Sequence, residues 1–270
     1  MKVWSVANQK GGVGKTTTVV NLGGLLASRG YRTLLLDMDP HGSMSSYFQL
    51  DPDITEDSLY RLFQIRGSRI AVDPREIVHA TRFEGLALLP ASTAMATLDR
   101  QLGVADGMGL VISRALKLLS ADYDFALIDC PPQLGVLMVN ALAACRHLVI
   151  PVQTEFLAVK GLERMLRTLT MIGRAGHPVP DYTILPTMFD RRTRASTSTL
   201  RLLRERHAAN LWRSVIPVDT QFREASRAGI PLTIRSPNDR GSVAYAELLD
   251  DLLAPSAQGS VSPVSMAGAS

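Results

Sequence analysis

Residues 3–29 place a short apolar run, a glycine-rich loop and a helical pattern directly one after another. The run VWSVAN at 3–8 has the length and the residue types of a buried strand. The loop KGGVGKTT at 10–17 holds three glycines, and apolar residues at helical spacing continue through 16–29. A strand, a glycine-rich turn and a helix N-terminus point backbone N–H groups at one place, where they can bind a phosphate group. This order predicts that the chain folds around a phosphate site.

The loop matches the P-loop pattern G-x-x-x-x-G-K-[ST] except at position 9, where Gln9 replaces the first glycine. Gln9 is acceptable there if its backbone is unstrained. The Lys15 amine is expected to reach the β- and γ-phosphate oxygens of a nucleotide, and the Thr16 hydroxyl to ligate Mg²⁺. An incidental lysine in a glycine-rich turn is the alternative, but it would not require this order of elements. The residues expected around the phosphates are Gly11, Gly12, Val13, Gly14, Lys15, Thr16 and Thr17.

Two further apolar runs end in aspartates. TLLLD at 33–37 ends at Asp37, with Asp39 two residues later, and FALID at 125–129 ends at Asp129. Because the C-terminal ends of parallel strands meet at one edge of a sheet, we expect these carboxylates beside the loop. There they could hold Mg²⁺ and orient an attacking water. Each could instead be an ordinary strand-terminating aspartate, but two of them beside a P-loop favour a catalytic site.

Short apolar runs alternate with helical patterns along the chain. Continuous apolar strands indicate a sheet that is covered on both faces, and alternation with helices indicates parallel strands joined by right-handed crossovers. We therefore predict an α/β fold with three layers, in which a doubly wound, mostly parallel central sheet has helices on both faces. Helices are expected over 16–29, 108–120 and 161–174. The strands are expected over 3–8, 33–37, 86–92, 125–129, 147–153, 182–188 and 214–219.

Composition divides the chain into one predicted domain over 1–254 and a small, polar segment over 255–270 that cannot bury enough surface to fold. Residues 50–85 interrupt the alternation with mixed charge, and we expect a helical insertion over one sheet edge. There is no apolar run of transmembrane length and no signal-peptide pattern at the N-terminus. Cys130 and Cys145 have no metal or redox spacing, so buried thiols in a cytoplasmic protein are expected.

The net charge is +4, but one stretch is far more basic than the rest. Residues 191–213 contain seven arginines, and their only acid is Glu205. Such a stretch could attract a nucleic-acid backbone or an acidic partner surface. A solvated helix face with ordinary arginines is the equally good alternative. The arginines are Arg191, Arg192, Arg194, Arg201, Arg204, Arg206 and Arg213.

KGGVGKTT, DMDPHGS and LIDCPP together resemble the ParA/MinD group of P-loop ATPases, which carry a deviant Walker A motif. The resemblance implies that Lys10 reaches across an ATP-dependent homodimer to the ATP of the partner. It implies that Lys15 and Thr16 hold phosphate and Mg²⁺, that Asp39 orients or activates the water, and that intrinsic turnover is slow. Lys10, Lys15 and Asp39 are thus the expected catalytic residues, and Thr16, Asp37 and Asp129 the expected metal site.

Later segments extend the resemblance. LPTMFDRRT at 185–193 and VIPVDTQFREAS at 215–226 are similar to the two segments that frame adenine in the family. The candidate base contacts are Pro186, Thr187, Pro217 and Asp219, although each proline could simply end a strand. Candidate contacts to DNA or a protein partner are Arg191, Arg192, Arg194 and Arg223. The chain has Val218 and Gln221 where partition proteins commonly have arginines, which weakens the DNA interpretation.

Within the family three uses have to be distinguished. The acidic segment VAYAELLDDLLA disfavours the basic membrane helix of MinD-like proteins, so no direct membrane insertion is expected. Chromosome or plasmid partition through non-specific DNA remains an alternative. Segments along almost the whole chain, such as DCPPQLGVLMVNALAA and PVQTEFLAVKGLERMLRTLT, are most similar to the ParC branch, which places chemotaxis arrays at the bacterial cell pole. This similarity implies a chemotaxis-associated cargo adaptor and a concentration of the protein at the pole.

Two other functional classes fit the sequence less well. A small-molecule ligase on the same fold would need a second substrate pocket with its own polar residues, and the sequence offers no separate set. An iron–sulfur reductase would place two cysteines per subunit around a shared cluster. Cys130 directly follows Asp129, and Cys145 lies in a predicted helix, so these positions do not match such a protein.

Overall fold

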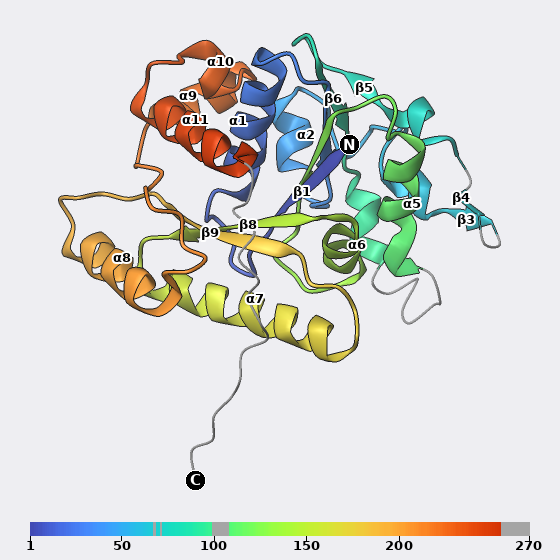
Figure 1. The fold of residues 1–270 in the computed structure, drawn as a ribbon. Coiled ribbons are helices and arrows are strands. Elements are labelled where there is room, and N and C mark those ends of the chain that lie inside the picture. The colour runs from blue at the N-terminus through green and yellow to red at the C-terminus, as the bar shows by residue number, and fades with distance from the viewer. Residues whose placement is uncertain (67–68, 71, 99–107, 255–270) are drawn as a thin grey trace.

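A mostly parallel sheet forms the centre of the computed structural model, which describes residues 1–66, 69–70, 72–98 and 108–254 (Figure 1). In this part of the chain seven strands lie in the order β5-β6-β2-β7-β1-β8-β9. All neighbours are parallel except β5 and β6. The strands are β1 (Lys2–Val6), β2 (Thr33–Asp37), β5 (His79–Ala80), β6 (Leu86–Leu89), β7 (Phe125–Asp129), β8 (His147–Gln153) and β9 (Asp181–Thr187).

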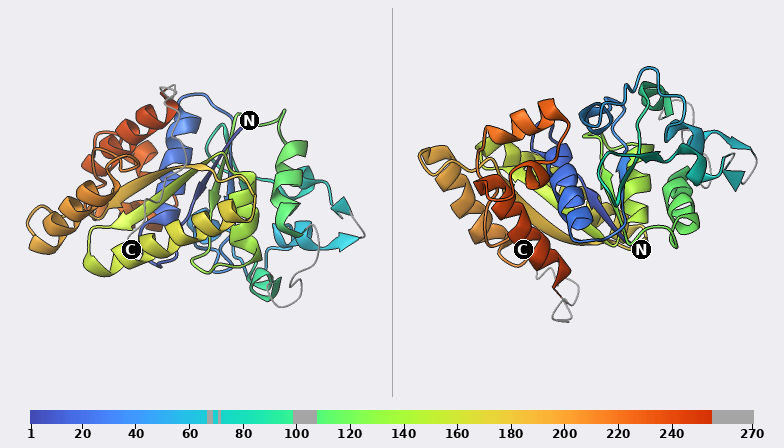
Figure 2. Two further views of the ribbon diagram at one scale, coloured as in Figure 1. Left: turned by 60° about the horizontal axis from the view of Figure 1, so that its bottom comes forward. Right: turned by 90° about the horizontal axis from the view of Figure 1, so that it is seen from above.

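Helices cover both faces of this sheet, as the two views in Figure 2 show. The helices α1, α2 and α11 pack on one face, and α3, α5, α6 and α7 on the other. The α-helices are α1 (Lys15–Ser28), α2 (Ser43–Tyr47), α3 (Tyr60–Phe63), α5 (Val111–Leu118), α6 (Val136–Ala144), α7 (Phe156–Arg174), α8 (Arg194–His207), α9 (Gln221–Ala228), α10 (Leu232–Arg235) and α11 (Arg240–Leu253). The described residues also form three 3₁₀ turns: η1 (Pro74–Ile77), η2 (Thr93–Thr97) and η3 (Met108–Leu110).

Successive side chains along each strand alternate between two separate hydrophobic cores. On β1, Val3 contributes to the core beneath α5, α6 and α7, whereas Trp4 contributes to the core beneath α1 and α11. Successive side chains of a strand point to opposite faces, so a strand that is apolar throughout needs a helix layer on each side. The predicted three-layer α/β fold is therefore confirmed.

One predicted strand is wrong. Residues 214–219 do not form a strand but lie beside the end of β9, where an isolated bridge joins Phe189 and Pro217. Ile216 donates a backbone hydrogen bond to Pro186 on one side of that bridge, and Val218 donates one to Phe189 on the other. β9 ends at Thr187, and the next residue, Met188, has a φ angle of +51°, which is not an extended conformation, so no regular ladder forms along 214–219. The remaining predicted strands are present, with ends that differ by up to three residues.

The insertion at 50–85 lies at the predicted sheet edge, but it is not mainly helical. It contains the four-residue segments α3 and η1, the short antiparallel pair of β3 (Ile65–Arg66) and β4 (Arg69–Ile70), and the edge strand β5. Its apolar residues do not recur at the regular spacing that gives a longer helix one apolar face for packing. The predicted unfolded segment 255–270 lies outside the described residues. No described helix is long and apolar enough to cross a membrane.

Candidate active site

The glycine-rich loop forms the cradle that the sequence predicts. Gly12 and Gly14 have φ angles of +73° and +93°, which side chains rarely permit, and a Cβ atom at either position would meet only open space. Helix α1 begins at Lys15, and no side chain caps its N-terminus. Its first N–H groups are therefore available to an anion, which the positive end of the helix dipole also favours.

Gln9 shows how the loop works without its first glycine. Among the described non-glycine residues only Gln49 and Met188 have positive φ angles, so the backbone of Gln9 is unstrained, as the sequence interpretation required. Its side-chain Nε2 donates to Thr168 Oγ1 on α7 at 2.8 Å. Gln9 thus attaches the start of the loop to a helix from the other sheet face.

Thr16 and Asp129 meet at the mouth of the loop. Thr16 Oγ1 donates to Asp129 Oδ2 at 2.6 Å. Asp129 is fully buried at the end of β7, and its other oxygen, Oδ1, has no hydrogen-bond partner among the described residues. A buried carboxylate oxygen without a donor is costly unless a ligand or cation meets it.

Asp37 is the neighbour of Asp129 across β2 and β7, and it is also fully buried. Its Oδ2 accepts from the backbone N of Ser45 at 2.7 Å and from Ser45 Oγ at 2.8 Å. Its Oδ1 accepts from the backbone N of Asp39 at 3.3 Å. Sequence reasoning assigned no role to Ser45, and the short spacing to Asp37 in DMDPHGSMS was the only available signal.

Burial and mutual repulsion disfavour the charged forms of these two carboxylates. Burial raises the pKa of Asp37 to about 6, against the hydrogen bonds from Ser45. Burial raises the pKa of Asp129 well above its usual range, and the nearby Asp37 carboxylate raises it further. The pair is therefore poised to exchange protons for a cation.

The residues around Asp129 fit Mg²⁺. The unpartnered Asp129 Oδ1, the Thr16 hydroxyl and the Asp37 carboxylate are hard oxygen donors of the kind this ion prefers. No group of three or more His, Cys, Asp or Glu side chains with metal-binding geometry occurs in the described part of the chain.

Asp39 follows the end of β2 and is held by its own loop. Its Oδ1 accepts from the backbone N of His41 at 3.1 Å and lies 2.8 Å from His41 Nδ1. Its Oδ2 has no hydrogen-bond partner among the described residues, and the side chain is 15% exposed. One oxygen of Asp39 is therefore fixed while the other is free to meet a water.

The second expected lysine does not enter the cradle. Lys10 Nζ lies 2.6 Å from Glu155 Oε1 and 3.5 Å from Gln153 Oε1, at the junction of β8 and α7. The Lys15 amine, by contrast, lies 3.5 Å from the backbone oxygen of Lys10. The two lysine amines therefore lie in different places: Lys10 Nζ contacts the start of α7, and Lys15 Nζ lies beside the backbone of the phosphate loop.

The two segments predicted to frame a base lie side by side. Ile216 N donates to Pro186 O, and Phe189 N donates to Ile216 O. Thr187 Oγ1 donates to Val13 O at 2.9 Å, so this hydroxyl supports the phosphate loop from below. Asp219 Oδ1 accepts from Gln221 N at the start of α9.

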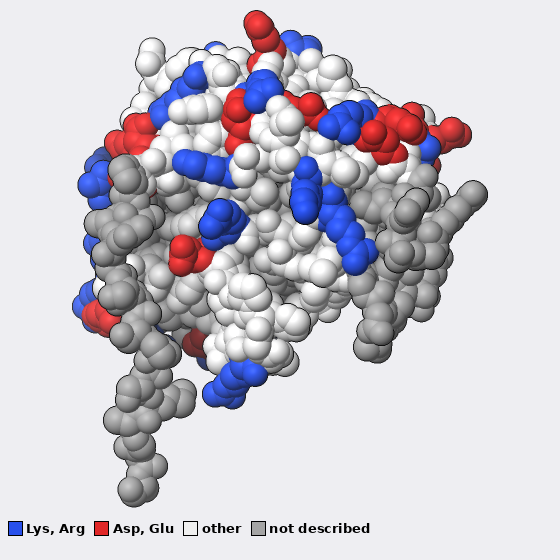
Figure 3. Space-filling model, turned by 45° about the vertical axis from the view of Figure 1, so that its right-hand side comes forward, with Lys and Arg blue, Asp and Glu red and all other residues white. Residues whose placement is uncertain are grey.

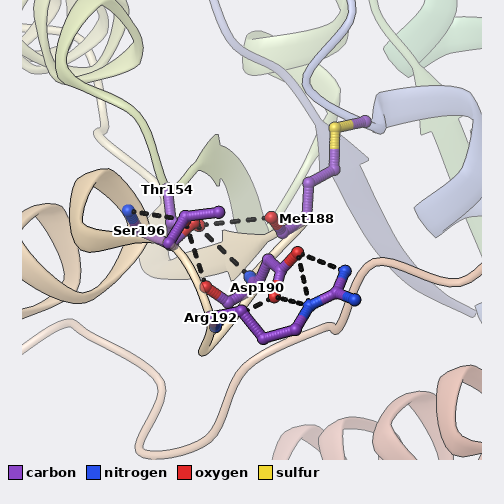
Figure 4. A network of polar contacts seen from close by, with 6 residues as sticks. Thr154, Met188, Asp190, Arg192 and Ser196 are labelled. Atoms are coloured by element: carbon purple, nitrogen blue, oxygen red, sulfur yellow. Dashed lines mark hydrogen bonds and ion pairs between the residues drawn. The ribbon is translucent and has the colours of Figure 1, made fainter.

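The turn after β9 is ordered by the polar network in Figure 4. Thr154 Oγ1 lies 3.3 Å from Met188 O and 3.0 Å from Ser196 Oγ, and Met188 has a φ angle of +51°. Arg192 forms a paired contact with Asp190, with Nη2 2.7 Å from Oδ2 and Nε 2.9 Å from Oδ1. The side-chain hydrogen bond from Arg192 is the main reason that the pKa of Asp190 is lowered to about 2.

The arginine-rich stretch is less uniformly basic than its sequence suggests. Arg192, Arg201 and Arg213 form ion pairs with Asp190, Glu205 and Asp251. The exposed arginines without an ion pair among the described residues include Arg191, Arg194 and Arg223. The unpaired arginines of the stretch, which also include Arg204 and Arg206, form no ion pair in the part of the chain that the structure describes that would compete with an external anion.

A cavity of about 250 Å³ lies beside the strand ends. Its lining includes His41, Gln133 and Leu137, and it borders the loop that holds Asp39. Cys130 and Cys145 are buried free thiols, as predicted.

Comparison with known proteins gives consistent matches along the chain. A protein-family model described as "AAA domain" matches residues 1–178. The sporulation initiation inhibitor protein Soj of Bacillus subtilis is 35% identical over 256 residues, which cover 94% of this chain and 98% of Soj. The chromosome partitioning protein ParA of Caulobacter vibrioides is 33% identical, with 94% of each chain covered.

A solved structure adds ligands to this comparison. The crystal structure of a cobyrinic acid a,c-diamide synthase from Mycobacterium smegmatis contains an ATP analogue and magnesium. It superposes with a TM-score of 0.80 at 34% identity, and the match covers 94% of each chain.

Lys15→Ala is expected to lower the affinity for ATP by about 100-fold or more, because two charge-assisted hydrogen bonds to phosphate would be removed at about 1.5–3 kcal/mol each. Isothermal titration calorimetry with Mg²⁺ and ATP measures this effect. Lys117→Ala on α5, away from the loop, is the matched control. Unchanged ATP affinity in Lys15→Ala would rule out the P-loop assignment.

The free energy of unfolding of the nucleotide-free protein should depend on pH through the titration of Asp37. The folded chain keeps a proton on this carboxyl up to about pH 6, whereas the unfolded chain releases it near pH 4. In this window the unfolded state binds fewer protons, so the contribution of Asp37 to stability is present below about pH 4 and is lost as the pH rises to about 6.

Asp37→Asn removes this titration, so the variant should gain stability relative to the wild type as the pH rises from about 4 to about 6. Urea unfolding without Mg²⁺ at several pH values measures the difference. Asp53→Asn, at an exposed site, is the control. A difference between Asp37→Asn and the wild type that stays constant with pH would contradict the raised pKa of Asp37.

Proposed function

The chain belongs to the ParA/MinD family of P-loop ATPases, and we propose that it uses an ATP-dependent dimer to position an intracellular cargo. It binds ATP with Mg²⁺ and hydrolyses ATP to ADP and phosphate. One observation carries the proposal of a dimer. Lys10, the lysine that an ordinary P-loop lacks, points away from the phosphate cradle of its own subunit. Its charge is therefore available for a second nucleotide only if another subunit approaches.

The residues of the cradle divide the work of hydrolysis. Backbone N–H groups from Gly11 to Thr16 and the Lys15 amine bind phosphate oxygens. Thr16, Asp129 and Asp37 would hold Mg²⁺, which neutralises charge on the phosphates. The free oxygen of Asp39 orients the attacking water while His41 fixes the other oxygen. Because Lys10 completes the site only in a dimer, turnover by the isolated subunit is slow.

The adenine contacts remain part of the proposal. Pro186 and Pro217 lie on adjacent segments next to the phosphate loop, a position that suits a base bound beyond the phosphates. The Thr187 hydroxyl is already used by Val13, so Thr187 would contact a base only through its backbone or methyl group. Asp219 supports the start of α9 and completes the proposed set of base contacts.

For the cargo we propose a chemotaxis-associated adaptor and a polar location, following the ParC-like segments at 129–144 and 151–170. These segments form the loop before α6, α6 itself, the end of β8 and most of α7. Leu134 and Phe156 are exposed on them, as an adaptor surface requires. The cytoplasm is the expected compartment.

The experiment that tests the cargo is a pull-down with Asp39→Ala, which should hold ATP without hydrolysing it. Chemotaxis receptors or coupling proteins should be recovered with Asp39→Ala and Mg·ATP, and should be absent with Lys15→Ala. Recovery of a DNA-bound partition partner in their place would show that the cargo is a chromosome or plasmid.

Chromosome or plasmid partition is the second candidate function, and the unpaired Arg191 and Arg194 favour it. Arg194 is the first residue of α8 and Arg191 lies in the turn before it, which the Thr154 network orders. Two relatives named chromosome partitioning protein ParA agree with this function. On the face shown in Figure 3 acidic and basic side chains are interspersed, so that face offers no uniformly basic surface to a nucleic acid.

Lys10→Ala is expected to bind ATP with nearly the affinity of the wild type but to remain a monomer. The reason is that Lys10 neutralises phosphate charge only across the dimer. Light scattering with Mg²⁺ and a non-hydrolysable ATP analogue reports the molecular mass. Lys2→Ala, at the opposite end of β1, should dimerise normally. An ATP-dependent dimer of Lys10→Ala would refute the action of Lys10 on the partner's nucleotide.

If DNA is a partner, Arg191→Ala with Arg194→Ala should weaken DNA binding at all sequences. The slope of log K against log salt should fall by about two, because each arginine neutralises about one phosphate. Arg213→Ala is the control, because Arg213 is already paired with Asp251. Fluorescence anisotropy with random duplex DNA measures the slope. If the wild-type protein shows no salt-sensitive binding, DNA is not a partner.

A further inference from the structure

Lys10 is already bound within its own subunit. Its amine lies 2.6 Å from Glu155 Oε1, and the side chains of Lys10 and Glu155 are 27% and 43% exposed. Gln153 Oε1, at 3.5 Å, gives the amine a second acceptor. An ion pair this short and only partly exposed fixes the amine at the start of α7.

The Glu155 carboxylate has no other structural task among the described residues. Glu155 occupies the N-cap position of α7, where a side chain commonly accepts hydrogen bonds from the first turn, but its side chain makes no cap hydrogen bond. Its carboxylate contacts Lys10 instead. The helix thus leaves its own N–H groups uncapped while its first acidic group holds the lysine.

The backbone beneath Lys10 is held as firmly as its amine. Asn8 Oδ1 accepts from Lys10 N, and Asn8 Nδ2 donates to Pro151 O at 2.7 Å. A Cβ atom on Gly161 would lie 2.8 Å from Asn8 Oδ1 and 2.9 Å from Lys10 Cβ, so α7 presses directly on this segment. Because the backbone is fixed, the ion pair can break only by rotation of the Lys10 or the Glu155 side chain.

From this arrangement we infer that Glu155 is an intramolecular latch, which holds Lys10 in the free subunit and must release it before two subunits share their nucleotides. The inference rests on the proposed action of Lys10 on the partner's ATP. ATP in a partner offers Lys10 several phosphate oxygens, which compete with the single carboxylate of Glu155. The neighbouring Phe156 and Leu157 are 68% and 67% exposed, so the latch lies on an open surface that an approaching subunit can reach.

The latch sets the protein concentration at which the dimer forms. A partly exposed ion pair lowers the population of the released lysine by about twofold to fivefold. The apparent affinity falls by the fraction of subunits that are competent. A dimer requires two released lysines, so the factor is squared, and the latch should weaken dimerisation by about 4-fold to 25-fold.

Glu155→Gln tests this inference because it removes the charge and keeps the shape of the side chain. With Mg²⁺ and a non-hydrolysable ATP analogue, the protein concentration at half dimerisation should fall by about 4-fold to 25-fold in sedimentation equilibrium. ATP affinity at concentrations where the protein is monomeric should not change. Glu163→Gln is the matched control, since it breaks the Lys160–Glu163 pair on the same helix.

Each outcome bears on a different claim. An unchanged or higher midpoint for Glu155→Gln, with a normally folded protein by circular dichroism, overturns the latch. A lower midpoint for Glu163→Gln as well would assign the effect to the charge of α7 rather than to Lys10, and also overturns it. An ATP-dependent dimer of Lys10→Ala overturns the proposed role of Lys10 itself, so the two failures are distinguishable.

Discussion

The parallel register of β1, β2 and β7 is the constraint on which the site depends. Asp37 and Asp129 are partners across β2 and β7, and Val6, the last residue of β1, is the partner of Asp129. A shift of one residue would turn each of these side chains to the opposite face of the sheet. The register therefore sets two carboxylates and the start of the phosphate loop at the same edge before any ligand binds.

That edge is electrostatically incomplete in the protein alone. Asp129 Oδ1 is buried without a donor among the described residues, and burial together with Asp37 raises the pKa of its carboxyl. Beside Asp129 in space, the uncapped N-terminus of α1 and the Lys15 amine form a positively charged cradle. One half of the site needs a cation and the other an anion, and both needs are met together by Mg·ATP. The unneutralised carboxylates and the positively charged cradle therefore both favour binding of the nucleotide together with Mg²⁺.

The sequence predicts the parts of this arrangement that local patterns determine. The strands at 33–37, 125–129 and 147–153 were located from apolar runs that end at polar residues, and the loop was located from its glycines. The failures depend on the tertiary structure. The strand expected at 214–219 is reduced to an isolated bridge at Pro217, beside the non-extended backbone of Met188. The anchoring of Val13 by Thr187 joins residues far apart in the chain, and no spacing in the sequence reveals it.

Gln9 and Lys10 are best understood together, because both connect the phosphate loop to α7. Gln9 reaches Thr168, Lys10 reaches Glu155, and Gly161 lets the helix approach the side chains of Asn8 and Lys10. A glycine at position 9 would satisfy the P-loop pattern but would leave this segment attached to α7 at fewer points. With the backbone held, motion is confined to the long side chain of Lys10. Gln9 and Lys10 therefore give the loop a fixed backbone with one movable charged side chain. The proposed contact between two subunits requires such a side chain.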